Sequence, residues 1–188
     1  MPQVLDQGHV ELVDHSGDEL RIVNFARASF GKTKKTFEDA DSKLIHYLLR
    51  HRHDTPFEAV DFTFHVKCPI SVAREWFRHR IGSFNELSGR YVELEPEFYI
   101  PHPNDVRTQI GKPGAYSYVP IHDEKRRTDI ILQMREAYHT AYSAYWNLLQ
   151  MGVAKELARN VLPVGLFTEF WWKLNARSLM NFLSLRNA

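Results

Sequence analysis

The chain has 188 residues, of which 44% are hydrophobic and 25% charged, which is typical of one globular domain and excludes a disordered or fibrous chain. The formal net charge of +1 provides no overall field that would attract nucleic acid or an anionic membrane. A single cysteine, Cys68, excludes an intrachain disulfide framework, and no apolar run reaches the roughly 18 residues of a membrane span, so we expect a cytoplasmic protein.

Apolar periodicity and capping residues predict the elements of the first half of the chain. In order, we expect a strand around 10–13, a helix from Asp18 to about Gly31, a helix over about 37–52, a strand over 60–66 and a helix from Pro69 to about Arg80. The strand over 60–66 alternates apolar and polar residues, so one of its faces should be buried. Proline suits the first position of a helix, because the N–H that it lacks would have no partner there.

The second half of the chain is predicted to combine a surface loop, three helices and one strand. In order, we expect an irregular surface loop from Pro101 to about Val119, a long helix from Asp123 to about Met151, a short helix that carries Arg159, a buried strand over 166–174 and a helix over 176–186. In the last helix the residues expected to face inward are Leu179, Met180, Phe182, Leu183 and Leu185. Because the elements show no repeated βαβ order, we predict an α+β fold, with an antiparallel sheet and several packed helices.

The stretch 78–91, RHRIGSFNELSGRY, combines three arginines with a histidine, a glutamate and a serine. It is too polar for the core, and its aromatic residues and glycines are unlike the charge pattern of a solvated helix face. Because guanidinium groups pair with phosphate or carboxylate oxygens, the stretch predicts an anion site. The alternative is a structural hub of salt bridges, and Glu75, three residues before Arg78, fits either interpretation.

Other chemistries have weaker support in the residues. Ser88 with His79 would suggest a serine hydrolase, but the strained G-x-S-x-G elbow of many hydrolases is absent. The histidines within 46–53 lack the spacing and the cysteine pair of a strong zinc signature, so we expect no metal. No glycine-rich dinucleotide loop or Walker loop occurs, so side chains and turn amides would have to hold any nucleotide phosphate.

The stretch 78–91 resembles the signature motif of the flavin-dependent thymidylate synthases, because Arg78-His79-Arg80 is followed by Ser88 at the expected distance. Four further blocks resemble the same family in the expected order: HDTPFEAVDFTFHVKCPISVAREWFRHR, EFYIP, LARNVLP and NARSLMNFLSLR. Together they cover most of the chain from about His51, and only the region from Pro101 to Lys125 has no counterpart.

The resemblance implies one catalytic domain over 1–188 that methylates dUMP to dTMP. Methylenetetrahydrofolate would supply the carbon, and NADPH would supply the hydride through FAD, the implied cofactor. The family forms homotetramers that share active sites between subunits, and the 13% aromatic content suits such an assembly. Neither nucleic acid nor a membrane is an expected partner.

The resemblance also implies which residues bind each ligand. The residues matched to the dUMP site are Glu75, Arg78, Glu86, Leu87, Ser88, Gly89, Arg90, Arg159 and Arg186. The residues matched to the FAD site are Ser29, His53, Thr55, Arg78, His79, Arg80, Glu86, Asn175, Arg177 and Asn181. Arg186 is the expected catalytic residue, because a fixed cation at the pyrimidine edge stabilises negative charge that develops there. We expect Ser88 to bind the substrate rather than attack it, since nothing nearby would deprotonate it.

Two features depart from the family pattern. Glu75 stands where many relatives carry glutamine, which adds a negative charge beside the expected substrate. The chain ends at Ala188 where family members continue into a further helical segment, so we expect that segment to be missing. Two alternative functions remain open: another flavin-dependent nucleotide-modifying enzyme, and a non-catalytic module that binds nucleotides or RNA through its arginines and aromatic residues.

Overall fold

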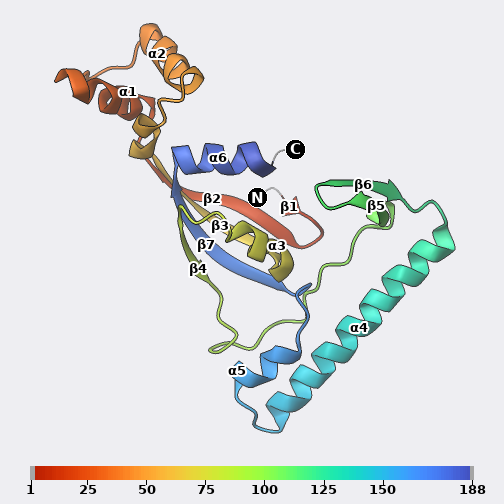
Figure 1. Ribbon diagram of the computed structural model, residues 1–188. Coiled ribbons are helices and arrows are strands. Elements are labelled where there is room, and N and C mark those ends of the chain that lie inside the picture. The colour runs from red at the N-terminus through yellow and green to blue at the C-terminus, as the bar shows by residue number, and fades with distance from the viewer. Residues whose placement is uncertain (1–2, 187–188) are drawn as a thin grey trace.

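The fold is centred on a five-stranded antiparallel sheet, in a computed structural model that describes residues 3–186 (Figure 1). The strands lie in the order β1-β2-β3-β7-β4, and β5 and β6 form a separate hairpin. The strands are β1 (Gln3–Val4), β2 (Gly8–Ser16), β3 (Asp61–Pro69), β4 (Ser83–Glu86), β5 (Arg107–Lys112), β6 (Ala115–Pro120) and β7 (Phe167–Asn175). The helices are α1 (Glu19–Arg27), α2 (Asp39–Arg50), α3 (Ile70–Trp76), α4 (Glu124–Gln150), α5 (Lys155–Ala158) and α6 (Ala176–Arg186), and the 3-10 turns are η1 (Ala28–Phe30), η2 (Thr55–Ala59), η3 (Pro103–Asp105) and η4 (Arg159–Val161).

The centre of the sheet pairs two strands that are far apart in the sequence. β3 pairs with β7 along its whole length, from Asp61 opposite Asn175 to Pro69 opposite Phe167. Successive side chains of a strand point to opposite faces, so the apolar residues of both strands gather on one face of the sheet. The pairing also brings α6, which follows β7 directly, back to the start of β3.

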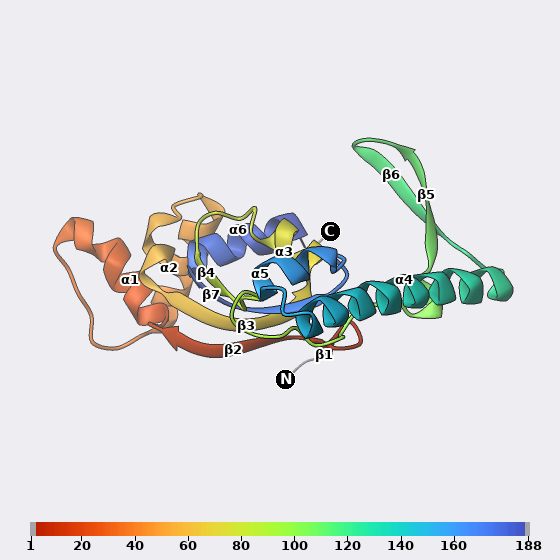
Figure 2. The same cartoon turned by 90° about the horizontal axis from the view of Figure 1, so that it is seen from below.

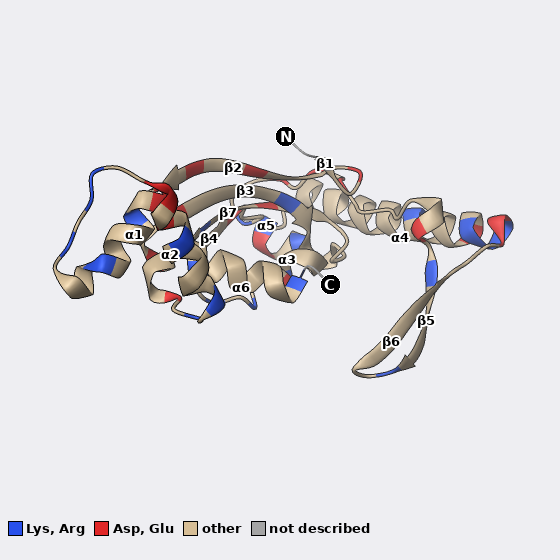
Figure 3. Cartoon of the chain, turned by 90° about the horizontal axis from the view of Figure 1, so that it is seen from above, with Lys and Arg blue, Asp and Glu red and all other residues tan. Residues whose placement is uncertain are grey.

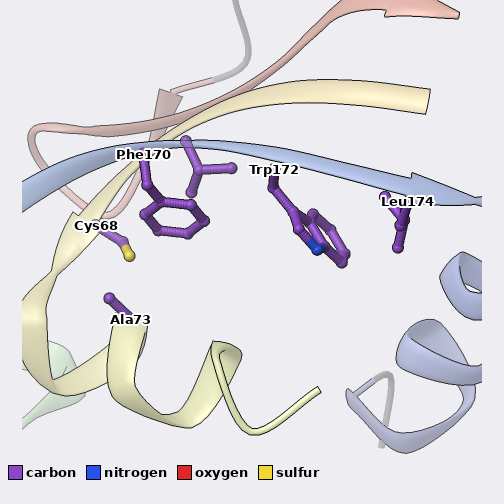
Figure 4. Packing of buried hydrophobic residues seen from close by; sticks show 6 residues of the cluster. Cys68, Ala73, Phe170, Trp172 and Leu174 are labelled. Carbon is purple, nitrogen blue, oxygen red and sulfur yellow. The ribbon is translucent and has the colours of Figure 1, made fainter. Parts of the chain in front are cut away.

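The apolar face of the sheet packs against α3 and α6 (Figures 1 and 4). The buried residues of this core are Val66, Cys68, Ala73, Phe170, Trp172 and Leu174. Figure 4 shows Cys68 and Phe170 pointing from the sheet toward Ala73 on α3. Cys68 is 5% exposed, which confirms that it is a core residue.

A second core lies at one end of the sheet, where α1 and α2 meet η2. Its buried residues are Ile22, Leu48, Phe57 and Val60. Beside it, the fully buried carboxylate of Asp41 accepts hydrogen bonds from Arg27 Nη2 at 2.9 Å and from Lys34 Nζ at 2.7 Å. The hydrogen bond from Lys34 is the main cause that holds the pKa of Asp41 below its usual value. These contacts fix the loop between α1 and α2.

The structure confirms the α+β class and most predicted elements. The carboxylate of Asp18 caps α1 by accepting from Arg21 N at 2.9 Å, and that of Asp123 caps α4 by accepting from Arg126 N at 3.0 Å. The predicted strands around 10–13, 60–66 and 166–174 lie within β2, β3 and β7, apart from single residues at their ends. Capping residues and alternation were therefore reliable signals here.

The helix expected from Pro69 to about Arg80 is shorter at both ends. Pro69 is the last residue of β3, with an extended backbone, and precedes the helix instead of opening it. α3 ends at Trp76, and Phe77 is its C-cap, whose N–H donates to Ala73 O at 2.8 Å and whose ring lies 4.8 Å from that of Phe84 on β4. The residues from 78 onward therefore form a connection to β4, a strand that the sequence analysis did not predict.

The prediction of an irregular loop over 101–119 was also wrong, since most of this segment forms the β5–β6 hairpin. Gly114 in its turn and Gly111 in β5 have φ values of +84° and +98°, a region that favours glycine. In α6 the prediction was wrong for Leu183 and Leu185, which are 51% and 61% exposed, whereas Leu179 and Phe182 pack on the core.

The helix α4 and the β5–β6 hairpin, which we call the arm, extend away from the sheet (Figures 1 and 2). Within α4 only Tyr145 is buried, and its hydroxyl accepts a hydrogen bond from Leu94 N at 3.1 Å. Every residue of β6 is exposed. In the part of the chain that the structure describes, no helix is both long and apolar enough to cross a membrane.

Candidate active site

The connection from β4 to Val92 and the turn η4 enclose a cavity of about 620 Å³. Its lining residues are Asn85, Glu86, Leu87, Ser88, Arg90, Tyr91, Val92 and Arg159. The structure thus brings Arg159 from a distant part of the sequence to the Glu86–Arg90 turn. The volume lies within the usual range of small-molecule sites.

The pairing of β4 with β7 positions the Glu86–Arg90 turn. Glu86 lies opposite Phe170, and Leu87 N then donates to Glu169 O at 2.8 Å, after which the chain leaves the sheet. Gly89 is closely packed, because a Cβ there would lie 2.8 Å from Leu94 Cδ1, the end of a flexible side chain, and 3.3 Å from Arg159 Cδ. The side chain of Arg159 therefore lies beside the turn.

The cavity contains cationic side chains that no carboxylate neutralises. None of the ion pairs within residues 3–186 includes Arg90 or Arg159. Ser88 Oγ accepts from Arg90 N and from Arg90 Nε, both at 3.4 Å, and the guanidinium of Arg90 lies 5.1 Å from the ring centroid of Tyr91. Two guanidinium groups and a hydroxyl in one cavity favour an anionic ligand.

A second cluster lies where the end of α6 meets the end of α3. Arg186 Nε donates to His79 Nε2 at 3.1 Å, and Arg186 Nη2 donates to the backbone oxygen of Glu75 at 3.1 Å. The carboxylate of Glu75 lies 3.6 Å from Arg78 Nη1 and 3.8 Å from Arg186 Nη2. Burial, and then the charge of Arg186, lower the pKa of His79, so the neutral imidazole that accepts from Arg186 is favoured.

The alternative interpretation of the stretch 78–91 as a hub of salt bridges is therefore correct only in part. The ion pairs include Glu75, Arg78 and Arg186, whereas Arg90 and Arg159 line the cavity and do not take part in them. The proposed pair of Ser88 and His79 is not formed, because Ser88 bonds with Arg90 and His79 bonds with Arg186. The serine hydrolase interpretation consequently has no structural support.

A third group of predicted residues lies along α6 and η2. Arg177 forms an ion pair with Glu58 of η2, and Asn175 Oδ1 caps α6 by accepting from Ser178 N at 2.9 Å. Asn181 is one turn beyond Arg177 and is exposed, as are His53 and Thr55 near η2. Arg80 is exposed on the connection that follows α3, and Ser29 is exposed in η1 beyond α1.

The structure adds lining residues that the list of predicted sites lacks. Asn85 and Tyr91 belong to the stretch 78–91, and Val92 follows it directly, so their place in the sequence was a usable signal. Across the described residues, no group of three or more histidine, cysteine, aspartate or glutamate side chains has the arrangement of a metal site.

Comparison with known proteins agrees with this geometry. The profile of the family described as thymidylate synthase complementing protein matches residues 11–188. A flavin-dependent thymidylate synthase of Thermosipho africanus is 50% identical over 184 residues, which are 98% of this chain and 79% of that protein. One from Thermus thermophilus is 49% identical over 185 residues, covering 98% of this chain and 66% of that protein. The crystal structure of a UMP/dUMP methylase, PolB from Streptomyces cacaoi, bound with 5-Br dUMP, superposes with a TM-score of 0.88 at 40% identity, covering 97% of this chain and 79% of that one.

A mixed helix and antiparallel-sheet fold with an arginine-lined cavity, matched over nearly its whole length, defines the class of a nucleotide-methylating enzyme. The chain belongs to the flavin-dependent thymidylate synthase family, and it is an enzyme of the methyltransferase type. The recognition made from the stretch 78–91 is confirmed, and the non-catalytic RNA-binding alternative loses its support.

Proposed function

We propose that this enzyme methylates dUMP to dTMP, with methylenetetrahydrofolate as the carbon donor and NADPH as the source of hydride through FAD. The observation that carries the proposal is the cavity in which the Glu86–Arg90 turn meets Arg159. Its volume of about 620 Å³ accommodates a mononucleotide, and its unpaired guanidinium groups suit the phosphate of one.

Within this cavity each residue has a separate role. Arg90 and Arg159 would pair with the phosphate oxygens of dUMP, since neither forms an ion pair with a carboxylate among residues 3–186. Ser88 Oγ accepts from Arg90 and keeps its own proton to donate to the substrate. Glu86 is acceptor-only as a carboxylate and would take hydrogen bonds from the substrate or the flavin. Together these contacts would hold the pyrimidine in one orientation, which is a large part of catalysis in a two-substrate reaction.

Arg186 would supply a fixed positive charge at the pyrimidine edge. It is held at its Nε by His79 and at its Nη2 by the backbone of Glu75, so its direction is set by two hydrogen bonds. A preorganised cation stabilises charge that develops in the transition state without a cost of reorganisation at that moment. The negative charge of Glu75 weakens the field of Arg186, which makes Glu75 relevant to the rate as well as to binding.

The predicted flavin residues fit the chemistry of FAD, which has an anionic pyrophosphate and a flat heteroaromatic ring. Arg78 and Arg80 are exposed cations on one connection, and Asn181 presents an exposed amide on α6. When bound, FAD would supply hydride transfer, and the protein would supply orientation and polar contacts to the ring. His53, Thr55, Asn175 and Arg177 would extend this surface toward η2.

The state of the single cysteine supports a mechanism without an enzyme thiolate. Burial, and then the charge of Glu86, raise the pKa of the Cys68 thiol to about 12. Its side chain lies in the core between the sheet and α3, away from solvent. A thiol of this kind is a poor nucleophile toward the pyrimidine ring, which is consistent with reduction through a flavin.

The proposal includes a homotetramer in the cytoplasm. The predicted dUMP residues fall into two clusters within one chain, the cavity around Arg159 and the group around Arg186. Sites that are shared between subunits would join such clusters across an interface. Exposed aromatic side chains on the arm, among them Tyr118 and Trp146, support the same view, because aromatic residues are enriched at subunit contacts.

The test of the proposal is dTMP formation from dUMP, methylenetetrahydrofolate and NADPH by the FAD-loaded protein, with a flavin-free control. We expect Arg159→Gln to raise the KM for dUMP about ten-fold or more, because a charged hydrogen bond is lost. Arg107→Gln on the hairpin is the matched control and should leave the KM unchanged. Absence of dTMP from the loaded enzyme, or an equal KM in both variants, would contradict the proposal.

UMP methylation is a second candidate function. The observation in its favour is the similarity to the PolB methylase from Streptomyces cacaoi, which was also solved with 5-Br UMP and superposes with a TM-score of 0.85 at 40% identity. Parallel assays with dUMP and UMP decide between the two substrates, since they differ only in the ribose 2′-hydroxyl.

A further inference from the structure

Thr168 is a buried polar residue on β7 that none of the predicted sites includes. Its side chain is 6% exposed, and Asp41 is the other buried residue of polar or charged type found within residues 3–186. A hydroxyl group in the core destabilises the fold unless a hydrogen bond satisfies it. The partner of this hydroxyl is therefore informative.

The partner of Thr168 is Glu86, which lines the cavity. Thr168 Oγ1 donates to Glu86 Oε1 at 2.7 Å, a short distance that is typical of a hydroxyl bound to a carboxylate. No ion pair within the described residues includes Glu86, so a hydroxyl, and not a cation, holds this carboxylate. The hydrogen bond at Oε1 restricts the orientations that the Glu86 carboxylate can adopt.

The hydrogen bond acts where the chain leaves the sheet. Glu86 is the last residue of β4, and Leu87 N makes the final backbone contact, with Glu169 O at 2.8 Å. The backbone of β7 is held on both sides, because it pairs with β3 along the whole of β3 and with β4. Thr168 thus connects the start of the Glu86–Arg90 turn to the centre of the sheet.

We propose that Thr168 is a positioning residue, whose hydroxyl orients the Glu86 carboxylate in the cavity and thereby sets the affinity for the nucleotide. The inference deepens the proposed function and rests on it for the identity of the nucleotide as dUMP. Thr168 acts through Glu86, so its loss should affect substrate binding more than the chemical step.

Thr168→Val removes the hydroxyl at nearly constant volume, whereas Thr168→Ser keeps it. We expect Thr168→Val to raise the KM and the Kd for dUMP about ten-fold, a factor equivalent to roughly 1.4 kcal/mol, with a smaller change in kcat. Thr168→Ser should restore the KM to within about two-fold of the wild type, since it retains a donor. In a Glu86→Gln background, Thr168→Val should have much less effect than in the wild type, because the two residues act through one hydrogen bond.

A second measurement needs no ligand. Amide hydrogen exchange in the segment 86–92 should be faster in Thr168→Val than in Thr168→Ser, because the turn loses its connection to β7. Thr108→Val removes a comparable hydroxyl from the hairpin, where Thr108 Oγ1 donates to Val119 O at 3.3 Å, and serves as the control that leaves this segment unchanged.

The outcomes separate the two proposals. Equal KM and equal exchange in Thr168→Val and Thr168→Ser would overturn the positioning role, and so would a lower Tm of Thr168→Val with an unchanged KM. If the wild-type protein neither binds nor converts dUMP, the proposed function fails, and the exchange of the segment 86–92 still decides the role of Thr168.

Discussion

The sheet with its two helices buries more of its apolar residues than the arm does. On the sheet, Trp172 is 2% exposed and packs with Phe84, Trp76 and Phe182. On the arm, Trp146 is 46% exposed. The sheet completes a core with α3 and α6 within one chain, although Trp171 of β7 is 48% exposed, whereas α4 buries Tyr145 alone. Stability should therefore depend more on the sheet than on the arm.

The charges follow no such division, since lysines, arginines and acids are interspersed over both regions (Figure 3). An overall electrostatic field would thus not direct the nucleotide to its site. Local arrangement decides instead, because within the described part of the chain Arg90 and Arg159 have no carboxylate partner, while other arginines, such as Arg177 and Arg27, are paired. The anion site depends on which arginines remain unpaired.

The largest expected effect is on Trp172. Trp172→Ala leaves a cavity in a packed aromatic core and should lower the free energy of unfolding by about 3–5 kcal/mol. Trp146→Ala on the arm is the matched control and should change it by about 0.5 kcal/mol or less at low protein concentration. Urea titration followed by circular dichroism measures both, and equal losses would erase the contrast between the two regions.

The reactivity of Cys68 reports on the same core. Its thiol pKa is raised from 9.0 to about 12, so at pH 8 its thiolate fraction is lower by roughly a thousand-fold, and burial slows the reaction further. We expect negligible modification by a disulfide reagent in the native protein and rapid modification in urea. Fast labelling of the folded enzyme would show that the core opens. Cys68→Ala should retain turnover, because no step uses the thiol.

A smaller effect concerns His79, whose pKa is lowered by burial and by Arg186. Because the pKa of His79 is lower in the folded protein, the unfolded chain binds the proton more readily. The stability that the neutral imidazole contributes is therefore fully present above about pH 6.5, and it is lost as the pH falls through the pKa of His79 in the folded protein. NMR titration should show a His79 pKa below its usual value. It should move upward in Arg186→Gln, and an unchanged titration would contradict the contact.

The smallest effect on stability is expected in the hairpin. Tyr118 is 54% exposed and lies 4.5 Å from the guanidinium of Arg107, so Tyr118→Ser should change the free energy of unfolding by about 0.5 kcal/mol or less. If the arm covers a partner subunit, the same substitution should lower the sedimentation coefficient at micromolar concentration. Val13→Ser on β2, which is also exposed, controls for the loss of any surface apolar group.

The sequence by itself determined the class of fold, the family and most elements. Caps such as Asp18 and Asp123, the alternation in β3 and the aromatic and β-prone residues of β7 are local signals of secondary structure. The hairpin was missed because its exposed strands bury no face and so leave no clear apolar period. The early end of α3 was missed because the chain after Phe77 leaves the helix to pair with β7 as β4, a long-range pairing that no local pattern encodes.

Only the tertiary structure decided which of the many arginines share a cavity. The side chain of Arg159 lies beside Gly89, and Arg186 donates a hydrogen bond to His79. In both cases the two residues belong to elements that are far apart in the sequence. The role of Thr168 is of the same kind, since it depends on the register that sets β7 beside the end of β4. Such contacts arise from long-range packing, whereas composition and periodicity report on neighbours along the chain.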